Sequence, residues 1–159
     1  VYKAKYGKFP MAETSSIGLT HDLGKGIMLQ YFPERFEAIT RFQAENPGKT
    51  FHETEIEIGY NWFKHEEVGA FFLNMWNLPD LLVNTALYHH EPERASQSLR
   101  PILEVLAFTN ELVTRIELME PEGVFDKSWV QEGFVSDNAL LDLVADIKKD
   151  MNDQYPVQV

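Results

Sequence analysis

The sequence predicts an all-α domain, a bundle of about six to eight helices joined by short loops. Apolar residues recur at three- and four-residue steps through most of the chain, which is the period of a buried helix face. Proline, glycine and asparagine separate these stripes and predict short connections between antiparallel neighbours. The 159 residues, 44% of them hydrophobic, are enough to bury one core.

Each apolar stripe predicts one helix and the face that it buries. The stripes are Val68, Phe71, Phe72, Met75 and Trp76; Leu81, Leu82, Thr85 and Tyr88; Ile102, Val105, Leu106, Thr109, Leu112, Val113 and Ile116; and Leu140, Leu141, Val144, Ile147 and Met151. The second of these helices can hold Pro79 in its first turn without losing a needed N–H. The breakers between stripes include Pro33, residues 46–48, Pro92, residues 121–123 and Gly133.

One segment alternates as a strand does, at residues 55–58. Thr50 and Glu53 stand just before it at the spacing of a capping box, so we expect a helix to begin there instead. Residues 117–135 are the least regular, and we expect Phe125, Trp129 and Phe134 to fold back onto the core. Residues 154–159 resemble a tail or linker, and a first residue other than Met suggests a fragment of a longer protein.

The charge and composition exclude several classes of function. With 25 acidic and 14 basic residues the net charge is -11, which argues against direct nucleic-acid binding. The chain has no cysteine, so neither disulfides nor thiolate metal sites can form. No apolar run approaches the ~20 residues of a membrane span, and no signal peptide opens the chain. We therefore expect a cytoplasmic protein without a membrane partner.

The segment His21-Asp22-Leu23-Gly24-Lys25 is the first candidate for chemistry. Adjacent side chains on a helix point about 100° apart, so a break at Gly24 is expected to bring His21 and Asp22 to one ion. Imidazole and carboxylate together suit Mn, Fe, Zn, Ni or Mg. Lys25 would then offer a positive charge to a phosphate. The alternative is structural, with Asp22 bonding a helix end while His21 packs against it.

Further histidines begin and end two of the expected helices. His65 opens the helix before Val68, and His89 and His90 close the next one. Histidines at a helix C-terminus also have a structural explanation, because imidazolium interacts well with the helix dipole. We assign no role to His52.

Taken in order, these motifs resemble a known family. His-Asp-x-Gly-Lys at residues 21–25, His-Glu-Glu-Val-Gly-Ala at 65–70, Trp-Asn-Leu-Pro at 76–79 and Tyr-His-His-Glu-Pro at 88–92 are similar to the HD superfamily of metal-dependent phosphohydrolases. Within it they look most like HDOD domains, the HD-related output domains of bacterial signalling proteins. The resemblance runs from about Phe9 to about Arg115. It implies a helical bundle joined to other signalling modules, frequently without enzymatic activity.

The chain departs from active HD hydrolases at two places. The resemblance implies another histidine well before the His-Asp pair, but residues 1–20 hold none. It also implies a metal-binding Asp on a later helix, where Asn110 stands instead and would hold a divalent ion more weakly. Pro-Glu-Arg-Ala-Ser follows the His-His-Glu, in place of the Asp-Gly-x-Gly-Tyr-Pro of cyclic di-GMP phosphodiesterases, which argues against that activity.

Two hypotheses follow from the resemblance. The first is a non-catalytic signalling module, with an HDOD-like core at 1–116 that lacks its N-terminal helices and an extension at 117–159. Its partners would be other signalling domains or proteins, with a homodimer as one option. The second is a metal-dependent phosphohydrolase acting on a phosphorylated small molecule, with Lys25 as its catalytic cation. In either case the metal ligands would come from His21, Asp22, His65, His89, His90 and Asn110.

Overall fold

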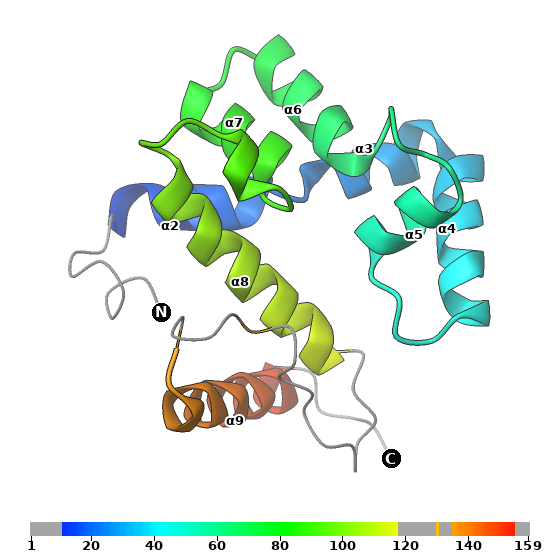
Figure 1. The fold of residues 1–159 in the computed structure, drawn as a ribbon. Coiled ribbons are helices and arrows are strands. Elements are labelled where there is room, and N and C mark those ends of the chain that lie inside the picture. Colours follow the sequence, from blue (N-terminus) through cyan, green and yellow to red (C-terminus); the bar gives the residue numbers. More distant parts are fainter. Residues whose placement is uncertain (1–10, 118–129, 131–134, 155–159) are drawn as a thin grey trace.

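The computed structural model describes residues 11–117, 130 and 135–154. Every regular element within these ranges is helical, which confirms the predicted all-α class (Figure 1). Phe125, Trp129 and Phe134, which were expected to fold onto the core, lie outside the described residues. In chain order the elements are α2 (Met11–Thr20), α3 (Leu23–Tyr31), α4 (Pro33–Glu45), α5 (Phe51–Glu57), α6 (His65–Met75), α7 (Asp80–Tyr88), the 3-10 helix η1 (Pro92–Arg94), α8 (Arg100–Glu117) and α9 (Asp137–Gln154).

Local signals fix several helix starts. The Thr50 hydroxyl accepts from the Glu53 N–H at 3.1 Å, and the Glu53 carboxylate accepts from the Thr50 N–H at 2.8 Å. This capping box begins α5, so the strand-like alternation at residues 55–58 is helical up to Glu57. Pro33 stands in the first turn of α4, where its missing N–H removes no helical bond.

Close approach of α3 and α6 organises the centre of the molecule. A Cβ built on Gly24 would lie 2.8 Å from the Gly69 nitrogen and closer still to the carbonyl oxygen of His65. Only glycine at position 24 therefore lets the two backbones pack at this distance. Around this contact two apolar clusters form, one on Ile27, Met28, Ile39 and Val68 and the other on Ala70, Leu73 and Ala86.

The predicted inner face of α6 is partly wrong. Val68 is buried and Phe72 is half-buried, but Phe71, Met75 and Trp76 are exposed. Small residues on the other side of the helix allow the closest contact with α3 and α7, so that side faces inward together with Leu73. The apolar residues of α6 thus lie on two faces of the helix, one buried and one exposed.

The last two helices make a separate apolar contact. In Figure 1, α8 runs obliquely across the molecule and α9 lies against its C-terminal half. The shared cluster consists of Phe108, Leu112, Ile116, Leu140 and Val144. From the α9 stripe, Leu141 is exposed, whereas Ile147 is packed against this cluster. Within the described residues no helix is long and apolar enough to cross a membrane.

Candidate metal site

The His-Asp pair occupies the turn between α2 and α3. The backbone of α2 ends when the His21 N–H donates to Ile17 at 3.0 Å, and the Lys25 N–H donates to the Asp22 carbonyl at 3.0 Å in the next turn. The expected break at Gly24 is therefore wrong, because Gly24 lies inside α3 and the break falls at residues 21–22. A turn frees adjacent side chains from the helical spacing, and His21 Nε2 lies 3.3 Å from Asp22 Oδ2.

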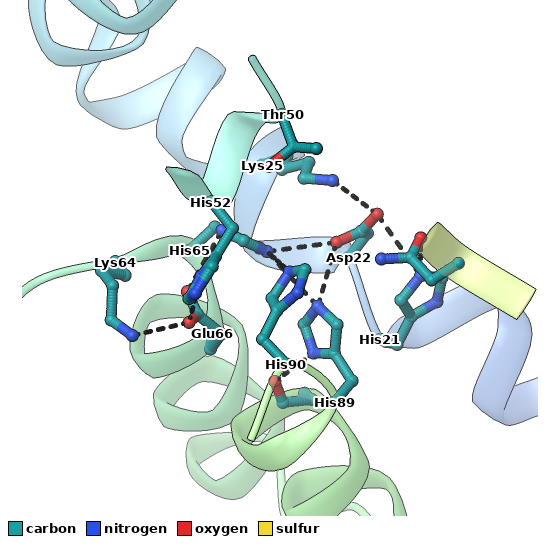
Figure 2. Close-up of polar contacts among 12 residues, drawn as sticks. His21, Asp22, Lys25, Thr50, His52, Lys64, His65, Glu66, His89 and His90 are labelled. Atoms are coloured by element: carbon teal, nitrogen blue, oxygen red, sulfur yellow. Dashed lines mark hydrogen bonds and ion pairs between the residues drawn. The ribbon is translucent and has the colours of Figure 1, made fainter. Parts of the chain in front are cut away.

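Two imidazoles contact the other oxygen of Asp22, and a third lies beside them (Figure 2). His65, the first residue of α6, places Nε2 3.3 Å from Asp22 Oδ1, and His89, just after α7, places Nε2 3.4 Å from the same oxygen. The Nε2 of His65 is also 3.4 Å from that of His89 and 3.2 Å from that of His90. One atom from each of these four residues lies within 4.8 Å of all the others.

Hydrogen bonds on the far side of two rings fix which nitrogen faces the centre. His65 Nδ1 lies 2.6 Å from Glu55 Oε2, and His89 Nδ1 lies 2.8 Å from the carbonyl of Ala86. Both oxygens only accept, so each Nδ1 carries a proton, and the Nε2 of each ring, which bears a lone pair whenever that ring is neutral, faces the centre. Asp22 Oδ1 is buried beside them and has no hydrogen-bond partner. The charge of this carboxylate oxygen is met either by an added proton on His65 or by a metal ion.

The donor set fits a divalent metal ion. A tetrahedral ion with ligand bonds of ~2.0–2.1 Å separates its ligands by about 3.3–3.4 Å, close to the 3.2–3.4 Å found between these ring nitrogens. Three imidazoles and one carboxylate suit borderline ions such as Zn, Fe, Ni or Mn better than Mg, which prefers oxygen. The Glu55–His65 contact is of the kind that orients a metal-bound histidine.

The buried carboxylate of Glu66 contacts several side chains that lie behind the imidazoles. Its Oε1 lies 2.8 Å from Lys64 Nζ and 2.9 Å from His52 Nδ1, and its Oε2 lies 3.2 Å from His65 Nδ1. The His52 ring also stacks on His90, with 4.1 Å between ring centroids. Sequence reasoning missed Glu55, Glu66 and Lys64 and gave His52 no role. The spacing of His52 and Glu55 by three residues on the expected helix was the available signal.

His52, Glu55 and Glu66 are also close enough to hold an ion, but their existing bonds favour a supporting role. Glu55 accepts from the His65 ring with one oxygen and from the His65 backbone N–H, at 2.7 Å, with the other. The ammonium of Lys64 already neutralises Glu66. These side chains therefore orient the rings in front of them.

Electrostatics favour a charged Asp22. Burial alone would raise the pKa of this carboxyl, but the close contacts with the His21, His65 and His89 rings outweigh it, with help from Lys25, and hold the pKa well below its usual range. Asp22 is therefore ionised at any physiological pH and offers a full negative charge to the centre.

The pKa values of the three imidazoles shift in different directions, because their neighbours differ. Burial lowers the pKa of His65, but contacts with Asp22 and Glu55 outweigh it and raise the pKa to about 8. Burial lowers the pKa of His89, and burial together with the nearby His89 and His65 lowers that of His90. Without an ion, one proton therefore sits on His65, while His89 and His90 are neutral.

The remaining predicted residues lie on the Oδ2 side of Asp22. His21 Nε2 is 3.3 Å from Asn110 Oδ1 on α8, and Lys25 Nζ is 2.7 Å from Asp22 Oδ2. His21 lies outside the group of four. The structure thus brings Asp22, His65, His89 and His90 together and places His21, Lys25 and Asn110 beside them.

Comparison with known proteins gives the family of the chain. The family described as HDOD domain matches residues 3–92, more than half of the chain. The chain belongs to the HDOD domain family. An uncharacterized protein of Treponema pallidum (strain Nichols) is 30% identical over 102 residues, which cover 63% of this chain and 19% of that relative's length. No solved structure matches. The HDOD match ends at Pro92, so Asn110 and α8 lie beyond it.

Proposed function

We propose that this HDOD domain is a regulatory module of a bacterial signalling protein, and that it holds one divalent ion without turning over a substrate. The observation that carries the proposal is the gathering of three imidazoles around Asp22, with one ligand atom from each of the four residues within 4.8 Å of all the others. Its partners would be other signalling domains or proteins in the cytoplasm.

The ion would be held by Asp22, His65, His89 and His90. Asp22 stands just before α3, His65 begins α6, and the other two follow α7, so one ligand set connects three helices. When bound, a divalent ion would supply positive charge to Asp22 Oδ1 and accept the lone pairs of the imidazoles. Occupancy of the site would therefore bias how these helices pack, which is what a regulatory module requires.

The Oδ2 side supports a site without turnover. There His21 meets the neutral amide of Asn110, 3.3 Å away, rather than a second carboxylate. Lys25 already neutralises Asp22 Oδ2 at 2.7 Å. A second ion at this side would find one imidazole, one amide oxygen and a competing ammonium, so it would be held weakly.

A metal-dependent phosphohydrolase is the second candidate, and the position of Lys25 favours it. Its side chain is 30% exposed at the accessible edge of the site, beside Asp22. A bound ion would supply Lewis-acid chemistry. Lys25 would hold a phosphate oxygen against that centre and offset its charge, which is the catalytic part assigned to it.

Metal content tests the ion. The purified full chain and an Asp22→Ala variant are incubated with Mn, Fe, Zn, Ni or Mg, freed of excess ion and analysed by elemental mass spectrometry. Asp80→Ala, which removes an exposed carboxylate from the start of α7, is the matched control. We expect about one ion per chain for the native and control proteins and none for Asp22→Ala. Equal content in all three proteins would rule out this site.

Activity separates the two candidates. The ion-loaded chain and a His65→Ala variant are assayed with phosphate monoesters, phosphate diesters and cyclic dinucleotides. The module predicts the same background rate for both proteins. Ion-dependent turnover that disappears in His65→Ala would replace the module with the hydrolase.

A further inference from the structure

The outer side of α6 and the end of α3 form an apolar surface that nothing within the described residues covers. We call it the α6 patch, and it consists of Tyr31, Phe71, Phe72, Met75 and Trp76. Tyr31 is 65% exposed, Phe71 63%, Met75 55% and Trp76 53%. The patch is continuous, because the half-buried Phe72 ring stacks on Tyr31 and touches Phe71 and Trp76 edge to face, with centroids 5.5–6.3 Å apart.

The size of the α6 patch indicates a function. Large side chains bury ~150–250 Å² each, so four that are more than half exposed offer on the order of 400–500 Å². Contiguous apolar surface of roughly 300–600 Å² on a folded chain often marks a binding site. The sequence agrees, because these residues follow the period of a buried helix face.

Charge identifies the kind of partner. The chain carries -11 overall, yet residues 68–79 and 26–33 contain no charged side chain. A strongly acidic or basic partner would find no complementary charge on this surface. Two copies of the chain, which repel each other elsewhere, could meet here without bringing like charges together.

We propose that the α6 patch binds the same patch on a second copy of this chain. A two-fold interface needs a surface that complements itself, and neutral aromatic rings do so. The exposed amide of Asn74, on the same helix, both donates and accepts, so it can pair with its own copy. The available area is below the ~800 Å² per partner of a standard stable interface, so the dimer should be weak and dissociate at micromolar concentration.

Sedimentation of the full chain over about 1–200 µM tests the proposal. The average mass should rise from 18.4 kDa toward twice that value as the concentration increases. Phe71→Asp should weaken association about tenfold or more, because it places a charge in the centre of the contact. Leu19→Asp, which changes an 83%-exposed side chain on α2, is the control and should behave as the native chain.

Cross-linking supplies an independent test, because the chain has no cysteine. Asn74→Cys should give a disulfide-linked dimer on mild oxidation, whereas Leu19→Cys should give far less. A native chain that stays monomeric throughout would overturn the proposal and leave the patch to a different protein. So would a dimer that Phe71→Asp does not weaken. Neither result depends on whether the site at Asp22 binds metal.

Discussion

The two oxygens of Asp22 have unlike surroundings. Oδ2 faces the ammonium of Lys25 at 2.7 Å and the ring of His21 at 3.3 Å. Oδ1 faces His65 and His89 at 3.3 and 3.4 Å, is buried, and has no hydrogen-bond partner. The Oδ2 side of the carboxylate is thus paired with an ammonium group of the chain, whereas the Oδ1 side is met by a proton on His65 or by a metal ion.

The charged groups around the site also leave one negative charge without a partner in the chain. Three carboxylates contact the histidines of the site, those of Asp22, Glu55 and Glu66. Two of these carboxylates are paired with an ammonium group, Asp22 with Lys25 and Glu66 with Lys64. The remaining negative charge is met by a proton on His65 or by a metal ion. A proton and an ion therefore compete for the Oδ1 side, and the predictions below follow from that competition.

The largest effect on stability and metal binding is expected from a substitution at Gly24, because the close contact of α3 with α6 at this residue supports both sides of Asp22. Gly24→Ala would force a Cβ into the backbone of α6 near Gly69 and His65 and push α3 away. We expect a loss of several kcal/mol of unfolding free energy, as for other overpacked cores, together with loss of metal binding. Urea unfolding and elemental analysis measure the two losses.

Gly26→Ala is the matched control for that substitution. Gly26 lies in the same helix, and a Cβ built there meets nothing within 4 Å. The variant should keep its metal and gain up to about 1 kcal/mol, because alanine favours helix. Equal behaviour of the two variants would show that the close contact of α3 and α6 does not hold the site together.

The next effect concerns the support behind the Oδ1 side. Glu55→Gln keeps the size of the side chain but removes the charge that orients His65 Nδ1 at 2.6 Å. Loss of such a partner typically weakens metal binding 10- to 100-fold. Titration with Zn or Mn measures the affinity, and Glu57→Gln on the exposed side of α5 serves as control. Unchanged affinity in Glu55→Gln would remove Glu55 from the site.

The competition between proton and ion predicts opposite pH dependences. In the ion-free chain the pKa of His65 is raised from 6.5 to about 8. Protonated His65 therefore contributes at most about 2 kcal/mol to the free energy of unfolding. This contribution is complete below pH ~6.5 and is lost as the pH rises through about 8. Ion affinity should instead increase with pH over this window, because binding displaces the proton. Urea unfolding with chelator, and ion titration without it, measure the two trends.

His65→Gln is the control for both trends. This variant should show neither the fall in stability between pH 6.5 and 8.5 nor the rise in affinity. If the ion-free native chain keeps constant stability over the same range, the proton is not held at His65.

The smallest effect on metal binding is expected on the Oδ2 side of Asp22, which is already paired with Lys25. Asn110→Asp would place a carboxylate beside His21, 3.3 Å from its Nε2, and supply the charge that the Oδ2 side lacks. We expect a second ion to bind weakly, at millimolar concentration, with less than tenfold change at the first site. Equilibrium dialysis with Mn measures this, and Asn138→Asp on α9 controls for added charge. A second ion bound as tightly as the first would show that one charge alone separates the two sides.

Much of the fold could be predicted because its signals are local. The helical period, the breakers and the Thr50–Glu53 capping box each depend on residues within a few positions of one another, and the all-α class is confirmed. The order of His21, Asp22, His65 and the His89–His90 pair also indicated the family that the chain belongs to.

What the sequence left open depends on how the helices pack. Periodicity showed that α6 has apolar residues at helical spacing, but the small residues that allow close packing turned Phe71 and Met75 outward. The turn at residues 21–22 was placed at Gly24, because a glycine in a helix signals a break unless another backbone lies against it. Glu55 reaches His65 only after α5 docks on α6, and no local pattern encodes that contact.

The first coordination shell of the bound ion tests the central claim most directly. X-ray absorption of the Zn-loaded full chain counts the imidazole nitrogens and oxygens around the metal. An ion on the Oδ1 side, held by Asp22, His65, His89 and His90, predicts three imidazoles and at least one oxygen at about 2.0–2.1 Å. A shell of oxygens with one imidazole or none would place the ion elsewhere and contradict the account.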